Sequence, residues 1–130
     1  MKQVSMLAWS RAAFAVFGAF LGAGIAGAVA ADALGIWAEP VAGACAAFAV
    51  VLSAYLFAPA GRLRVAFAAL VLGALAAWHI VGDASFPESY GGQAYLPTEL
   101  PLICTIGAAL LALGCATLLS RRLSIRSHGA

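Results

Sequence analysis

The chain has 130 residues, of which 65% are hydrophobic and only 9% are charged, and its mean hydropathy is +1.02. A soluble domain needs charged residues at about a quarter to a third of its surface positions, and this chain has too few. The net charge of +2 is small and the bases are scattered, which excludes a nucleic-acid-binding surface. The composition therefore predicts an integral membrane protein.

Basic and acidic groups alternate along the chain, and an apolar stretch separates each group from the next. In chain order the groups are Lys2 with Arg11; Asp32 with Glu39; Arg62 with Arg64; Asp83, Glu88 and Glu99; and Arg121, Arg122 and Arg126. At about 1.5 Å of helical rise per residue the stretches measure about 28 to 34 Å, which matches a hydrocarbon core of about 30 Å. We therefore expect four spans, at about residues 12–32, 40–60, 64–82 and 100–120.

The spans predict the fold class. Backbone amides in hydrocarbon must be satisfied within a helix or a closed barrel, and the sequence lacks the period-two alternation of a barrel. We expect an all-α protein, a single transmembrane domain built as an antiparallel, up-down four-helix bundle. Because Lys and Arg stay on the cytoplasmic side, both termini are expected in the cytoplasm, and the acids on the far side of a bacterial inner membrane.

The first span has an alternative interpretation. Two bases, an apolar run and Ala28-Val29-Ala30 resemble a secretory signal with a small-residue cleavage site. The apolar run is longer than the usual core of such a signal. We therefore expect the segment to be retained as a span.

Small residues recur within the spans at helical spacing, and such spacing lets helix backbones approach closely. Gly18, Gly22 and Ala26 stand four residues apart in the first span, and Gly43 with Ala47 repeats the spacing in the second. The pattern predicts tight packing, either within the bundle or against a partner. The glycines expected at such contacts are Gly18, Gly22, Gly43, Gly73, Gly107 and Gly114.

The long connection at residues 83–99 contains two prolines and two adjacent glycines, and its length and polarity predict a contact surface. Loops on a rigid scaffold carry function more often than the scaffold does. We expect a periplasmic or membrane partner to contact this loop, through Glu88, Tyr90, Tyr95 and Glu99. The alternative is a loop that is simply solvated.

His79 is the only histidine inside a span, and it stands beside Trp78 and four residues before Asp83. A histidine and a carboxylate on one helix face can share a proton, as a quinone-headgroup site or a proton relay requires. The alternative is an interfacial histidine held by Asp83. One intramembrane histidine cannot supply both axial ligands of a b-type haem, so no intrinsic cofactor is expected, and a quinone or lipid is the expected bound group.

The remaining polar groups within the spans are not expected to form a catalytic, metal-binding or transport site. The three cysteines lack a CxxC spacing and are expected to be structural thiols. As an alternative, Cys45 and Cys104 lie at similar depth and could meet. The chain has too few ligands for a zinc site. No catalytic motif is present, so we expect no enzyme activity. A stand-alone transporter needs a polar or charged group at mid-membrane, where the chain offers only Ser53, Thr105 and Thr117.

Two segments carry a family resemblance. IWAEPVAG at residues 36–43, followed by Arg62 and by FAALVLGALAAWHIVGD at residues 67–83, resembles the multi-helix membrane domain of the quinoprotein glucose dehydrogenases. The resemblance covers spans two and three, about a third of the chain, and implies a membrane anchor related to a quinone-linked dehydrogenase. The matching positions are Trp37, Pro40, Gly43, Trp78 and Asp83. These 130 residues hold no counterpart of that family's large catalytic domain, so sugar oxidation is not implied.

A second resemblance, through Phe86-Pro87 and Leu100-Pro101, is to the small four-helix subunits of tripartite carboxylate transporters. The features together predict a small non-catalytic subunit that packs into and stabilises a larger membrane complex, of respiratory or quinone-linked type. The alternative is a small membrane subunit of a secondary transporter. Copurification of redox subunits or of a large permease would distinguish the two.

Overall fold

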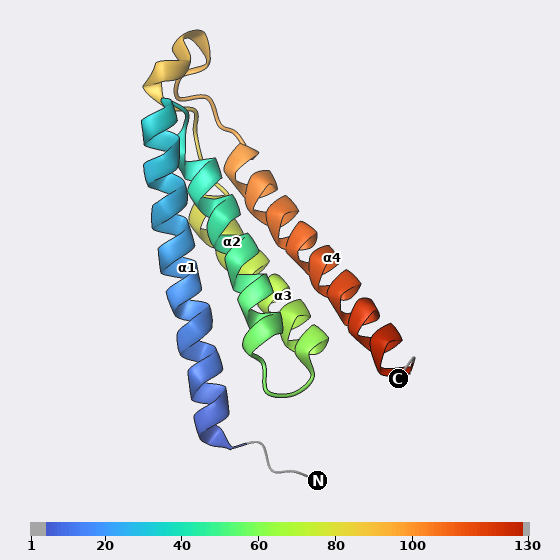
Figure 1. The fold of residues 1–130 in the computed structure, drawn as a ribbon. Coiled ribbons are helices and arrows are strands. Elements are labelled where there is room, and N and C mark those ends of the chain that lie inside the picture. Colours follow the sequence, from blue (N-terminus) through green and yellow to red (C-terminus); the bar gives the residue numbers. More distant parts are fainter. Residues whose placement is uncertain (1–4, 129–130) are drawn as a thin grey trace.

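The computed structural model describes residues 5–128, with side chains described through residue 125. In this range the chain forms four long helices and one short 3-10 helix (Figure 1). The elements are α1 (Met6–Leu34), α2 (Ala38–Phe57), α3 (Arg62–Val81), η1 (Glu88–Gln93) and α4 (Leu100–His128). Each long helix is long and apolar enough to cross a bilayer, so the chain is a multi-pass membrane protein.

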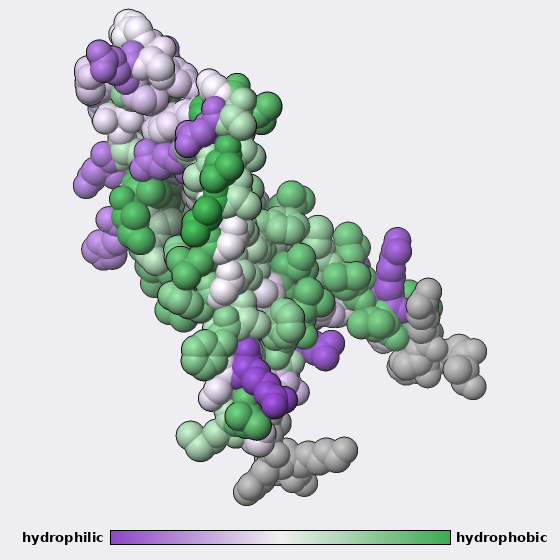
Figure 2. Space-filling view, turned by 60° about the vertical axis from the view of Figure 1, so that its left-hand side comes forward, coloured by the Kyte–Doolittle hydropathy of each residue, from purple (hydrophilic) through white to green (hydrophobic). Residues whose placement is uncertain are grey.

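The long helices run alternately up and down, so that α1 begins and α4 ends at the same end of the molecule (Figure 1). This confirms the predicted all-α, four-helix membrane bundle. We call this end, with Arg11, Arg62 and Arg122, the basic end, and the opposite end, with Asp32 and Glu99, the acidic end. Figure 2 shows the apolar band between the two polar ends.

The outer helices extend beyond the expected spans. α1 begins at Met6 rather than near residue 12, and α4 continues to His128 rather than ending near residue 120. Helical geometry thus continues past the apolar stretch into the polar surroundings at the basic end. Lys2 lies outside the described residues, and so does the side chain of Arg126.

Local chemistry sets the ends of α1. The side-chain oxygen of Ser5 accepts a hydrogen bond from the backbone N–H of Ala8 at 3.3 Å, which satisfies one of the free amides of the first turn. At the other end Gly35 adopts the left-handed conformation, with φ of 66°, and its N–H and that of Ile36 bond back to the last turn. The three-residue connection that follows makes α2 the antiparallel neighbour of α1.

The core lies among α2, α3 and α4. Its buried residues are Val51, Tyr55, Ala66, Leu70, Ala109, Ala112 and Ala116. α1 contributes none of these, and of the long helices in the described range it contacts only α2. α2 contacts the other three long helices and is therefore the central element of the bundle.

α1 lies on α2 through a stripe of small residues, Gly24, Gly27 and Ala31, which we call the inner stripe. Gly27 and Ala31 are buried. A Cβ added at Gly27 would lie 3.0 Å from both Cβ and Sγ of Cys45 and 3.2 Å from the backbone Cα of Ala42. Only glycine therefore allows the two backbones to approach this closely without a shift.

The same glycine-to-alanine substitution should have different effects on stability at two positions of the inner stripe. Gly27→Ala forces a methyl group against the α2 backbone, so we expect it to destabilise the protein by about 1 to 3 kcal/mol. At Gly24 an added Cβ would meet the Cβ of Ala46 at 3.5 Å, an ordinary contact. Gly24→Ala should therefore range from neutral to about 1 kcal/mol stabilising, because alanine is the better helix former.

The measurement is reversible unfolding of the purified protein in mixed micelles, followed by the loss of helical circular dichroism as the denaturing detergent is increased. Equal stability changes for the two variants would contradict the close contact at residue 27.

Candidate functional site

α1 carries a second stripe of small residues, Gly18, Gly22 and Ala26, which we call the outer stripe. At about 100° of rotation per residue, the centres of the inner and outer stripes lie about 170° apart around the helix. All three residues of the outer stripe are exposed. A Cβ added at Gly18 or Gly22 would meet nothing within 4 Å. α1 thus offers one small-residue face to α2 and leaves an equivalent face open on the opposite side.

A lateral groove lies between α1 and α3, two helices that make no contact with each other in the described chain. Gly24 and Ile25 line its α1 wall, Gly73 and Ala77 line its α3 wall, and α2 and α4 form its floor. Its volume is about 420 Å³. The lining is apolar apart from one hydroxyl on the floor, so the groove can hold hydrocarbon groups and offers almost nothing to a polar solute.

That hydroxyl belongs to Thr105, and it is already satisfied within its own helix. Its Oγ1 donates to the carbonyl oxygen of Pro101 at 2.7 Å. The other mid-membrane candidates behave in the same way, because Ser53 donates to Val50 O at 3.1 Å and Thr117 donates to Gly114 O at 2.7 Å. Each of these hydrogen bonds stays within the helix that carries the hydroxyl.

The six glycines expected at close contacts divide into two groups. Gly43 lies at the α2–α4 interface, where an added Cβ would collide with Oγ1 of Thr105. The other five have open space on their Cβ side: Gly18, Gly22, Gly73, Gly107 and Gly114. At these five positions no atom of a neighbouring helix lies within 4 Å of an added Cβ, and Gly73 faces the lateral groove. Close contact with a partner stays a prediction.

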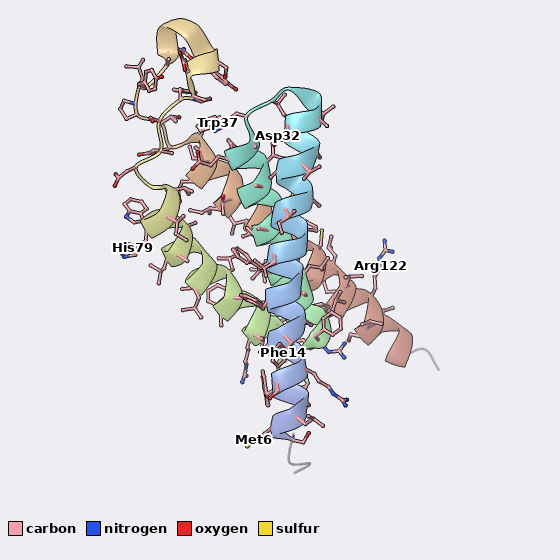
Figure 3. All side chains as sticks on the ribbon, turned by 90° about the vertical axis from the view of Figure 1, so that its left-hand side faces the viewer. Met6, Phe14, Asp32, Trp37, His79 and Arg122 are labelled. Carbon is pink, nitrogen blue, oxygen red and sulfur yellow. The ribbon has the colours of Figure 1, made fainter. Side chains whose placement is uncertain are left out.

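The expected pairing of His79 with Asp83 is absent. α3 ends at Val81, and Asp83 lies in the turn that follows, so the helical four-residue spacing does not carry over to it. Neither side chain makes a hydrogen bond or ion pair with the rest of the described chain. His79 points away from the bundle (Figure 3), and Trp78 beside it is 67% exposed. A quinone at this position would have to be held from outside the chain.

The connection between α3 and α4 is folded rather than extended in solvent. The N–H of Phe86 donates to Leu96 O at 3.0 Å, that of Tyr95 to Phe86 O at 2.9 Å, and that of Thr98 to Ala84 O at 2.9 Å. These bonds close a short hairpin whose tip contains η1. The loop therefore has a defined shape at the acidic end (Figure 1).

Three aromatic rings join the loop to the rest of the protein. Trp37, at the start of α2, lies with its ring centroid 5.8 Å from that of Phe86 and 6.1 Å from that of Tyr90. Phe86 and Tyr90 lie 5.4 Å apart. We call these three residues the aromatic cluster. Sequence reasoning missed it, because residues so distant in the chain give no local signal of contact.

The four loop residues expected at a partner contact differ in their surroundings. Tyr90 belongs to the aromatic cluster and is 43% exposed, whereas Tyr95 is 70% exposed. Glu88, in η1 at the tip of the hairpin, and Glu99, at the end of the loop, are also exposed. Tyr95 has a positive φ of 64°, a conformation that costs a bulky residue energy and that clusters at functional sites.

The three cysteines are free thiols, and Cys45 does not pair with Cys104. Cys45 instead lies beside the inner stripe, where its Cβ and Sγ would each be 3.0 Å from a Cβ added at Gly27.

No family model, curated protein or solved structure matches the chain.

The aromatic cluster should control how firmly the loop is held. Phe86→Ala removes a ring that contacts both Trp37 and Tyr90. We therefore expect residues 84–98 to exchange their amide hydrogens at least about tenfold faster, which corresponds to a loss of about 1.4 kcal/mol of local stability. Tyr95→Ala removes an exposed ring outside the cluster and should leave exchange nearly unchanged. Hydrogen exchange read by mass spectrometry measures both; equal acceleration in the two variants would show that the cluster does not hold the loop.

Proposed function

We propose that the chain is a small non-catalytic subunit of a larger membrane complex, and that a helix of a partner protein lies against the outer stripe of α1. The observation that carries this proposal is the pair of opposed glycine faces on one helix. One face is used inside the chain for close approach to α2, and the other has the same chemistry and no neighbour among residues 5–128.

Helix energetics support a partner on that face. A glycine within a helix costs about 0.8 to 1.0 kcal/mol relative to alanine, and a lipid-facing glycine gains no packing in return. Helices in a bilayer associate through close backbone approach rather than through hydrophobic burial, and small residues four apart serve that purpose. Gly18 and Gly22 are therefore best explained as a packing surface for another helix.

The position of α1 gives further support. It is held by a single neighbour, and only 11% of its most apolar window is buried. The exposed Tyr95 and the acidic residues of the loop supply a second, polar contact at the same partner or at a neighbouring subunit. The proposed respiratory or quinone-linked class of the complex rests on the sequence resemblance alone.

Site-specific crosslinking in the native membrane tests the proposal. A photoreactive amino acid at position 22 should yield a covalent product with a transmembrane segment of a different protein, identified by mass spectrometry. Adding Gly18→Leu should reduce that product by about tenfold, because overpacking of that packing surface costs more than about 1.4 kcal/mol.

Position 21 provides the matched control, because Leu21 is exposed on the same helix, lies about 100° from the centre of the outer stripe and lines the lateral groove. The photoreactive group placed there should yield mainly lipid adducts. Products at position 22 that contain only lipid, or only a second copy of this chain, would contradict the proposed role.

A further inference from the structure

A second pocket lies at the basic end, between the α2–α3 hairpin and the last turns of α4. Its volume is about 480 Å³. Three side chains with polar groups line it, Tyr55, Arg62 and Arg122, together with aliphatic residues of α2 and α4. This pocket is separate from the lateral groove and shares no lining residue with it.

The charge in the pocket is uncompensated. The guanidinium groups of Arg62 and Arg122 make no hydrogen bond or ion pair with another described residue. The five acidic residues of the chain all belong to the acidic end. Arg62 is also the first residue of α3, whose first turn holds no acidic side chain and whose N-cap Gly61 provides no capping group. The partial positive charge of that helix end adds to the attraction for an anion.

Tyr55 adds a polar group held in place by the core. The residue is only 3% exposed and belongs to the core cluster. Its hydroxyl oxygen has no hydrogen-bond partner among the described residues. Every fully buried polar side-chain atom in that range has a partner, so the Tyr55 hydroxyl cannot be fully buried. The small exposed part of Tyr55 must therefore include the hydroxyl, at the pocket that the residue lines.

The depth of the pocket identifies the kind of anion. Leu119 lies about 28 Å along α4 from Leu100 at about 1.5 Å per residue, close to the full thickness of a hydrocarbon core. The pocket is thus at the level of lipid headgroups. Leu56 and Leu119 give it an apolar wall beside the two arginines. Headgroup phosphate and adjoining acyl chains meet these requirements together.

We propose that this pocket binds the headgroup of an anionic phospholipid. Arg62 and Arg122 donate hydrogen bonds to the phosphate oxygens, as guanidinium groups do in fork geometry, and the Tyr55 hydroxyl donates a further one. The acyl chains lie along the aliphatic residues of α2 and α4. The site holds α4 against the α2–α3 hairpin through the lipid, and it does not depend on a protein partner.

Lipid retention by the purified chain tests the site. The protein is incubated with phosphatidylglycerol or with phosphatidylcholine of the same acyl chains, and bound lipid is counted by native mass spectrometry. We expect preferential retention of phosphatidylglycerol. Each arginine contributes about fivefold, so Arg62→Gln with Arg122→Gln should lower that retention by about 25-fold. Tyr55→Phe keeps the core ring and should lower it severalfold.

Arg11→Gln with Arg64→Gln is the matched control, because it removes two exposed arginines from the same end that do not line the pocket. Retention in this variant should stay within about twofold of the wild type. An equal loss in both double variants would show diffuse charge attraction and overturn the site, as would equal retention of phosphatidylcholine by the wild type.

Two further arms use the wild-type chain and so do not depend on a variant that folds. Raising sodium chloride should lower phosphatidylglycerol retention and leave phosphatidylcholine unchanged. Inorganic phosphate, compared with chloride at equal ionic strength, should not displace the lipid. Displacement by inorganic phosphate would assign the pocket to a free phosphate group and contradict the lipid proposal, and so would retention that does not respond to salt.

Discussion

The close approach of α1 to α2 at Gly27 is the contact on which the arrangement of the helices depends. Lipid tails are as apolar as the side chains, so burial of hydrocarbon gives these helices no reason to associate. What remains is dispersion between closely spaced backbones, and that requires the absence of side chains at the contact. Gly27 meets this requirement, and α2 is the only long helix in the described range that α1 contacts.

Charge has a different role in this structure, because it sets the levels at which polar surfaces occur. The acids belong to one end and the described arginines to the other, so the middle of the bundle holds no ionisable side chain other than cysteine and tyrosine. A charge at the bilayer centre costs about 2.5 to 3.5 kcal/mol on the insertion scale. The folded loop therefore lies at the acidic end and the pocket lined by Arg62 and Arg122 at the basic end. The lateral groove between them is apolar.

Much of the fold could be predicted from the sequence, because the alternation of charges and the lengths of the apolar stretches are both encoded locally. The number of long helices and their alternating direction follow from these two features. The extension of α1 to Met6 could not be predicted, since a helix can continue past its apolar stretch where a serine cap satisfies its first turn. The family resemblances stay predictions.

The candidate surfaces were harder to predict. Two glycine stripes with similar spacing lie on α1, and spacing alone does not indicate which of them packs inside the chain. His79 and Asp83 have helical spacing in the sequence, but the helix ends between them at Val81. The aromatic cluster and the pocket at the basic end each consist of residues from separate elements. Only the folded chain brings these residues together.

The central claim is that the inner stripe of α1 is occupied by α2 and the outer stripe by a partner. Nitroxide labels at positions 22 and 31, read by electron paramagnetic resonance for oxygen accessibility, test it directly. In the purified chain, position 22 should be accessible to lipid-dissolved oxygen and position 31 should be shielded. In native membranes both should be shielded; a label at position 22 that is as accessible there as in the purified chain would contradict the account.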